Sequence, residues 1–148
     1  MQTVLEVKQV TKQYGQQYAL DHVSLSIQKG DIYGLIGKNG AGKTTLLKTI
    51  SRLIHVNSGT VSVFGSQNSK EWNEALRKIG TVIETPVAYN QMTAYQNLNY
   101  YCKVHQITQP DQLIKETLDY VGLSNTGKKK FRNFSLGMKQ RLGIAIAL

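Results

Sequence analysis

The amino-acid sequence predicts a mixed α/β fold whose first part combines strands with helices and whose second part is entirely helical. Short alternating or apolar runs typical of strands occur up to residue 83. A glycine-rich loop follows one of these runs and leads into a helix. From residue 91 onward, apolar residues recur only at helical spacing. We therefore expect two regions, residues 1–90 and residues 91–148.

The predicted strands come from period-two alternation and from short apolar runs. Leu5 and Val7 alternate with Glu6 and Lys8, which is the period of a half-buried strand over residues 4–10. Residues 13–16 are expected to turn the chain. Further strands are predicted at residues 23–27, 31–36, 60–64 and 81–83.

The predicted helices have recognisable start signals. Thr93 with Gln96 three positions later forms a capping box, and Pro110 suits a first helical turn. Ser69 is expected to cap a helix over residues 70–79, and a last helix begins near Ser135. One more helix follows the glycine loop, with apolar positions at Leu46, Leu47, Ile50, Leu53 and Ile54.

Composition describes an ordinary globular protein. Of its 148 residues, 41% are hydrophobic and 18% charged, and the formal net charge of +9 suits nucleic acid, an anionic membrane or polyphosphate ligands. The single cysteine, Cys102, excludes an internal disulfide and is expected to be a small buried hydrophobe. Because the sequence shows neither signal-peptide character at the start nor a membrane-length apolar run, we expect a cytoplasmic protein.

The glycine loop fits the pattern G-x-x-x-x-G-K-[ST], the phosphate-binding loop of nucleotide-binding proteins. Its glycines allow successive backbone N–H groups to face phosphate oxygens, while Lys43 adds a positive charge and the Thr44 hydroxyl can ligate Mg²⁺. The loop lies between a predicted strand and a predicted helix, as the pattern requires. The sequence therefore predicts an ATP site formed by Gly37, Lys38, Asn39, Gly40, Ala41, Gly42, Lys43, Thr44 and Thr45.

With three further motifs, the chain resembles the ATP-binding subunit of ABC transporters over its whole length. Tyr14 follows Thr11-Lys12-Gln13, residues 83–86 read Ile-Glu-Thr-Pro, and residues 134–142 read Phe-Ser-Leu-Gly-Met-Lys-Gln-Arg-Leu. The last stretch is similar to the signature usually written LSGGQ. The resemblance implies a P-loop nucleoside triphosphate hydrolase fold of ABC type, with an antiparallel β subdomain and an α-helical subdomain.

The resemblance also implies roles for individual residues. Tyr14 would stack on adenine, and Lys43 and Glu84 would be the catalytic residues present. Thr44 and Glu84 would hold Mg²⁺. Ser135 and Gly137 would contact the γ-phosphate of ATP bound to a second nucleotide-binding subunit, which makes a homodimer the expected assembly.

Departures from the family pattern resemble its bacitracin-export and lantibiotic-immunity branch. Glu84 stands where glutamine is usual, and Leu136 and Met138 replace a glycine and a glutamine of the signature. Glu84 keeps an oxygen for Mg²⁺ but loses the amide donor and adds negative charge beside the phosphates.

The family's Asp-Glu pair and its histidine loop, which follow the signature, do not occur within these residues. None of the 9 acidic residues comes after Asp119. We therefore expect the N-terminal part of a subunit, truncated before the Walker B strand and catalytically incompetent by itself. The unpaired edge of its sheet predicts a dimer or a strand-swapped oligomer.

The expected function is coupling of ATP hydrolysis to export of a peptide antibiotic or similar substrate. The partner would be a separate membrane-spanning permease, which would hold the subunit at the inner face of the cell membrane. One alternative is a soluble ABC-type ATPase acting on nucleic acid or the ribosome, which the positive charge would suit. Another is a nucleotide-binding fragment without catalysis.

Simpler interpretations remain for several residues. Tyr14 can be an ordinary aromatic at a strand end, and Ser135 only a helix cap. Residues 128–132 carry four basic side chains that read as a solvated turn, because no nucleic-acid recognition motif accompanies them, so nucleic acid is not an expected partner. The three histidines have no metal-ligand spacing: His22, His55 and His105.

Overall fold

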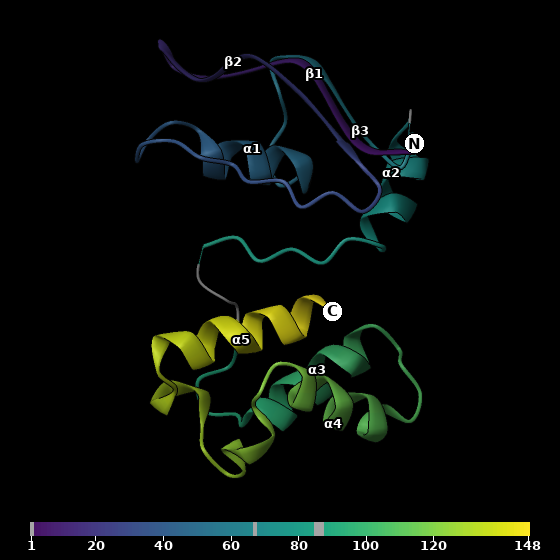
Figure 1. Ribbon diagram of the computed structural model, residues 1–148, viewed down its shortest axis with the longest axis vertical. Helices are drawn as coiled ribbons and strands as arrows, with labels where there is room; N and C mark the ends of the chain where they lie inside the picture. The colour runs from purple at the N-terminus through teal and green to yellow at the C-terminus, as the bar shows by residue number, and fades with distance from the viewer. Residues whose placement is uncertain (1, 67, 85–87) are drawn as a thin grey trace. The chain divides into compact units, whose positions relative to one another are not determined.

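The computed structural model describes residues 2–66, 68–84 and 88–148, and the chain divides into two compact units. We call Met1–Ile79 the sheet unit and Gly80–Leu148 the helical unit. All the described strands belong to the sheet unit, and the three longest of the described helices belong to the helical unit (Figure 1). The division at residue 90, which rests on the change from mixed strands and helices to helices alone, stays a prediction.

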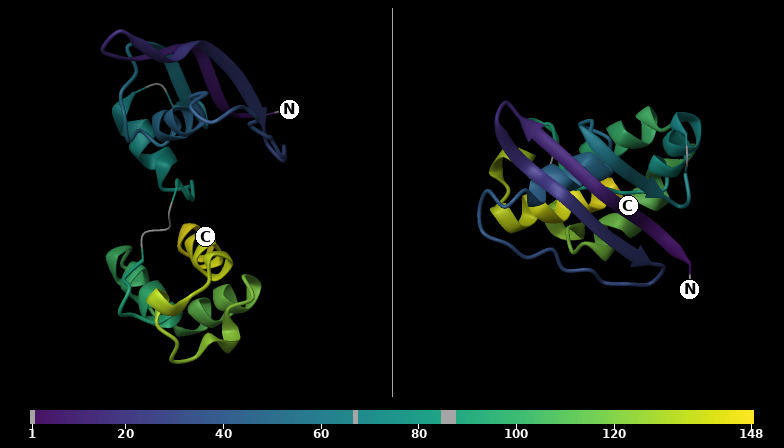
Figure 2. Two further views of the ribbon diagram at one scale, coloured as in Figure 1. Left: turned by 90° about the vertical axis from the view of Figure 1, so that its left-hand side faces the viewer. Right: turned by 90° about the horizontal axis from the view of Figure 1, so that it is seen from above.

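The sheet unit contains a three-stranded antiparallel sheet. Its strands are β1 (Thr3–Tyr14), β2 (Gln17–Gln28) and β3 (Ser58–Val63) in the order β2-β1-β3, and Figure 2 shows β1 between the other two. β1 and β2 form a hairpin in which Tyr14 pairs with Gln17. The strands predicted at residues 4–10, 23–27 and 60–64 are therefore confirmed, but β1 continues to Tyr14 and β2 already begins at Gln17.

One helix covers a face of this sheet. Helix α1 (Lys43–Ile50) buries Leu46 against Val7, Val10 and Leu20 of the first two strands. The helix is shorter than the apolar spacing predicted, because its last turn closes in a Schellman arrangement around Arg52, whose φ is 56°. There Leu53 N donates to the carbonyl of Lys48 at 2.8 Å and Arg52 N to that of Thr49 at 3.0 Å.

Helix α2 (Ser69–Leu76) begins with a different cap from the one expected. The side chain of Asn68, not that of Ser69, accepts hydrogen bonds from Lys70 N at 3.1 Å and Glu71 N at 3.0 Å. Ser69 is already helical, and its hydroxyl accepts instead from the guanidinium of Arg52 at 2.9 Å. Since Asn and Ser are both good caps, the sequence alone could not separate adjacent candidates.

Two predicted strands are not strands in this structure. Residues 31–36 and 81–83 have no ladder hydrogen bonds, and the side chains of Ile32 and Ile36 are fully exposed. A strand exists only through pairing with a neighbour, and within the described residues the sheet contains only β2, β1 and β3. The apolar runs are present as predicted, but among the described residues neither of them pairs with a neighbouring strand.

The helical unit consists of α3 (Ala94–Val104), α4 (Pro110–Tyr120) and α5 (Leu136–Ala147), with two short 3₁₀ helices, Ser124–Thr126 and Phe131–Asn133. The predicted capping box is confirmed, because Gln96 N donates to the Thr93 hydroxyl at 3.1 Å and Thr93 N to the Gln96 side chain at 2.9 Å. Over the described residues, no helix has the length and apolar character that crossing a bilayer requires.

All three helices contribute to one hydrophobic core. Ile114 of α4 and Leu142 of α5 are almost completely buried there, and Cys102 of α3 is buried with them. Burial raises the pKa of the Cys102 thiol, because the charged thiolate loses its hydration. The expectation that Cys102 packs as a small hydrophobe is therefore confirmed.

Candidate functional site

The loop that precedes α1 has the geometry of an anion-binding turn. Gly40 and Gly42 have φ values of 82° and 83°, which side-chain-bearing residues rarely adopt. Gly42 is also the cap residue of α1, and no side chain caps that helix end. The first N–H groups of α1 therefore point toward solvent at the positive end of the helix dipole, where an anion is stabilised.

Gly42 has a second reason to be glycine. A β-carbon built on it would lie 2.2 Å from the carbonyl oxygen of Ala19 in β2. At Gly40, by contrast, a β-carbon would meet nothing within 4 Å. The loop is thus pressed against the hairpin at Gly42, and this contact fixes where α1 begins.

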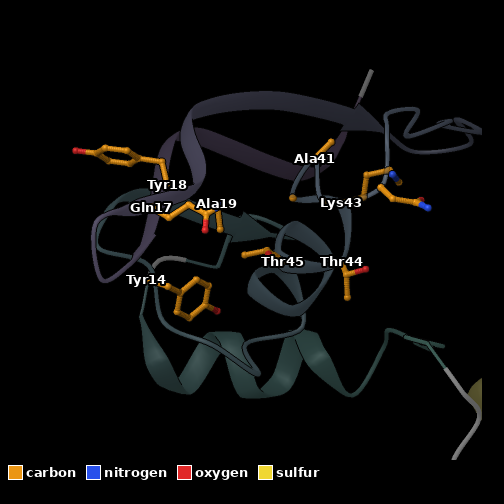
Figure 3. A pocket seen from close by; sticks show the side chains of 11 residues that line it. Tyr14, Gln17, Tyr18, Ala19, Ala41, Lys43, Thr44 and Thr45 are labelled. Carbon is orange, nitrogen blue, oxygen red and sulfur yellow. The ribbon is translucent and has the colours of Figure 1, made fainter.

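Hairpin and loop together enclose a pocket of about 370 Å³ (Figure 3). From the loop and α1 it is lined by Asn39, Gly40, Ala41, Gly42, Lys43, Thr44 and Thr45. From the hairpin it is lined by Tyr14, Gln17, Tyr18 and Ala19. The structure therefore brings Tyr14 together with seven of the nine predicted loop residues, across a long separation in sequence.

Lys43 is held by the remaining two loop residues. Its ammonium donates hydrogen bonds to the carbonyl oxygens of Gly37 at 2.6 Å and Lys38 at 2.7 Å. An ammonium has three donors, so one further hydrogen bond to a ligand is available without breaking these two. The side chain is anchored at the mouth of the loop and offers a positive charge there.

The Thr44 hydroxyl is suited to bind a hard cation that accompanies phosphate. Thr44 is exposed in the first turn of α1 and lines the pocket, so its hydroxyl oxygen can reach a ligand. Hydroxyl and carboxylate oxygens are the donors that Mg²⁺ prefers. The described residues contain no cluster of three acidic, histidine or cysteine side chains that would hold a metal without such a ligand.

Tyr14 ends β1 and is 52% exposed. Figure 3 shows its ring on the same side of the hairpin as Thr45, whereas the ring of Tyr18 points away from the loop. Such an aromatic face at one end of a phosphate-binding pocket is suited to stacking on a nucleotide base.

Sequence reasoning missed the hairpin residues Gln17, Tyr18 and Ala19. The pairing of Tyr14 with Gln17 across a two-residue turn brings the start of β2 to the same pocket edge. The signal in the sequence was the tight turn after Tyr14, because a hairpin that closes there places the first residues of the second strand beside Tyr14.

The other predicted site residues belong to the helical unit. Glu84 is exposed, and its φ of 63° is unusual for a residue with a side chain. Thr85 and Pro86, which complete its motif, lie outside the described residues.

Asn97 of α3 has a structural role. It is fully buried, accepts a hydrogen bond from Tyr89 N at 2.7 Å and donates to the carbonyl of Thr93 at 3.0 Å. It therefore fixes the segment between residue 89 and α3.

Ser135 and Gly137 lie at the beginning of α5. The Ser135 hydroxyl accepts a hydrogen bond from Met138 N at 3.3 Å, so the expected capping role is confirmed. A β-carbon on Gly137 would meet nothing within 4 Å, which makes the first turn of α5 open on that side. Leu136, between them, is exposed.

With this geometry established, comparison with known proteins identifies the family. The profile of the family described as ABC transporter matches residues 20–148, most of the chain. The chain belongs to the ABC transporter family. The region matched contains the whole glycine loop, the Glu84 motif and the signature.

Curated relatives of this ABC family member match along all or nearly all of the chain. It is 44% identical over 148 residues to the bacitracin transport ATP-binding protein BcrA of Bacillus licheniformis, covering 100% of this chain and 48% of that protein. It is 40% identical to the lantibiotic transport ATP-binding protein SrtF of Streptococcus pyogenes, covering 98% of this chain and 61% of that one. The chain thus spans about half to three-fifths of the length of these relatives.

Solved structures support the fold. The structure described as the ATP binding subunit of an ABC transporter superposes with a TM-score of 0.81 at 29% identity, over 97% of this chain and 61% of that one. The expected ABC-type fold is confirmed by this likeness, together with the antiparallel sheet and the helical unit.

Proposed function

We propose that this chain is the ATP-binding part of an ABC transporter subunit, which in full length hydrolyses ATP to ADP and phosphate. The observation that carries this proposal is the pocket in which Tyr14 and residues 39–45 meet. Tyr14 would bind the base, and the loop would bind the triphosphate. A pocket lined by both an exposed aromatic side chain and an uncapped helix start suits a nucleoside triphosphate better than an inorganic anion, because the anion has no base for the aromatic ring.

The triphosphate would be held by three kinds of donor. The first N–H groups of α1 and of the loop would face phosphate oxygens, favoured by the helix dipole. Lys43 would use its remaining donor on the β- and γ-phosphates while Gly37 and Lys38 keep its ammonium in position. During transfer, negative charge develops on the γ-phosphate oxygens. The positive charge of Lys43 would therefore also stabilise the transition state.

Mg²⁺ would be held by the Thr44 hydroxyl and the Glu84 carboxylate. When bound, it neutralises phosphate charge and orients the β- and γ-phosphates. Glu84 would contribute a full negative charge where a glutamine would contribute a neutral amide. This charge would make ATP binding depend more strongly on Mg²⁺. We infer that removing Mg²⁺ weakens ATP binding more in this protein than in its Glu84→Gln variant.

Catalysis would need more than these residues. No acidic residue follows Asp119, so these residues supply no side-chain carboxylate after the signature to orient an attacking water. We infer that these 148 residues bind ATP but do not hydrolyse it. Ser135 and Gly137 would complete the site of a second subunit by offering a hydroxyl and the open start of α5 to its γ-phosphate.

The transported substrate is proposed from the relatives. Two of them are named for bacitracin and lantibiotic transport, and both compounds are peptide antibiotics. We propose export of a compound of this kind, through a separate membrane-spanning permease that would keep the subunit at the inner face of the cell membrane.

The phosphate loop is tested by Lys43→Ala, with ATP affinity measured by isothermal titration calorimetry in the presence of Mg²⁺. We expect affinity to fall at least about tenfold, since a charge-assisted hydrogen bond to phosphate contributes about 1.5–3 kcal/mol. The matched control is Lys70→Ala, which removes an exposed lysine of α2 in the same unit and should leave affinity unchanged. Unchanged affinity in Lys43→Ala would refute the proposed site.

A further inference from the structure

The aromatic end of the pocket has a second component that the loop motif does not include. The ammonium of Lys12 lies 5.0 Å from the ring centroid of Tyr14, within the range of a cation–π interaction. Both side chains come from the last residues of β1, two positions apart, and positions two apart share a face of a strand. The pair is therefore built into the strand itself.

Tyr14 has little else to fix its ring. It is the last residue before the hairpin turn and is half exposed. Among the described residues, no other ring stacks against it and its hydroxyl makes no hydrogen bond. An exposed aromatic side chain at a strand end is free to change rotamer unless a neighbour restrains it. Lys12 is the neighbour that does so here.

Lys12 has no acidic partner that would draw its ammonium away from Tyr14 among the described residues. In the part of the chain that the structure describes, no carboxylate lies within ion-pairing distance of its ammonium. Elsewhere on β1 the situation differs, because Lys8 pairs with Glu6 at 2.9 Å. The charge of Lys12 is thus directed at the ring of Tyr14 rather than at an acidic partner.

We propose that Lys12 is a positioning residue for base recognition, because it covers one face of the Tyr14 ring and leaves the opposite face for the nucleotide base. This inference rests on the proposed function, since it assigns the base end of the same pocket. A ring with one face taken stacks on a base in one orientation only. The ring is therefore preorganised, and less conformational freedom is lost when the nucleotide binds.

The test compares ATP with inorganic tripolyphosphate, which has the phosphates and no base. Calorimetric affinities are measured for the unsubstituted protein, Lys12→Met, Lys12→Arg, Tyr14→Leu and the Lys12→Met/Tyr14→Leu double variant. Lys12→Met keeps the side-chain length and removes the charge, and it should weaken ATP binding about two- to fivefold, the effect of an exposed cation–π contact. Tripolyphosphate affinity should not change, and Lys12→Arg should retain ATP affinity because guanidinium also interacts with aromatic rings.

Two results would overturn the inference. If Lys12→Met weakens ATP and tripolyphosphate equally, Lys12 acts as a general positive charge. If it has the same effect in the Tyr14→Leu background, it does not act through the ring. Lys8→Met, which removes a lysine of the same strand away from Tyr14, is the control for charge. Failure of the proposed function is recognised separately, because ATP affinity would then be insensitive to Lys43→Ala.

Discussion

The helical unit is built from elements that make their own backbone hydrogen bonds, whereas the sheet unit depends on pairings between distant segments. In the helical unit, three helices enclose a core that includes Ile114 and Leu142. In the sheet unit, α1 and the sheet bury a smaller cluster around Leu46, while Ile32 and Ile36 remain fully exposed. A helix satisfies its backbone hydrogen bonds within its own segment, whereas an apolar segment becomes a strand only when a neighbouring strand pairs with it.

The difference also separates the roles proposed for the two units. The pocket lies wholly in the sheet unit and is formed by a hairpin and a loop held together at Gly42. The helical unit presents the start of α5 with Ser135 as its cap. Nucleotide binding is thus assigned to the unit with the smaller core, and the signature to the unit with the larger one.

A cavity in the core of the helical unit should cost the most stability. Leu142→Ala removes a fully buried side chain enclosed by several elements and should lower the free energy of unfolding by about 2–5 kcal/mol. Leu46→Ala in the sheet unit should cost less, because a single helix over a three-stranded sheet can relax into the space. Urea unfolding followed by circular dichroism measures both. Equal losses would remove the contrast between the two cores.

The next effect tests the contact that holds loop to hairpin. Gly42→Ala and Gly40→Ala both impose a positive φ on alanine, at a cost of about 1–2 kcal/mol each. Only Gly42→Ala also forces a β-carbon against the Ala19 carbonyl. It should therefore be the more destabilising of the two in urea unfolding followed by the fluorescence of Trp72, the chain's single tryptophan. Similar losses in both variants would mean that the close approach at Gly42 is not a constraint.

The smallest effect concerns the buried thiol of the helical unit. Since burial raises the pKa of Cys102, its neutral form is favoured in the folded state. The contribution of this thiol to the free energy of unfolding is fully present below the pKa of the unfolded chain, about 8.5. It is lost as the pH rises through the higher pKa of the folded protein. We expect slow reaction with a thiol reagent in the folded protein and fast reaction in urea. Equal rates would show that the core of the helical unit is open.

Much of the helical unit could be predicted from sequence because its signals are local. The Thr93–Gln96 capping box, Pro110 and the Ser135 cap each involve residues within one turn of each other. The hairpin was predictable for a similar reason, since its strands are joined by a tight turn. The Asn68 cap was missed because two good capping residues are adjacent.

The sheet unit shows what sequence patterns do not contain. Residues 31–36 have strand composition, but pairing depends on a partner that composition does not specify. The phosphate loop was recognised by its spacing, yet the approach of Gly42 to Ala19 is a contact between distant segments. Gln17 and the other hairpin residues of the pocket were missed for that reason, whereas Tyr14 was found through the family resemblance.

Hydrogen–deuterium exchange with and without MgATP tests whether the pocket of hairpin and loop binds ATP. We predict slower exchange in peptides covering residues 14–19 and 37–46, because both sides of the pocket would be ordered by one ligand. Residues 110–130 of the helical unit should exchange at the same rate in both conditions. Unchanged exchange at the loop, or protection confined to the helical unit, would contradict the account.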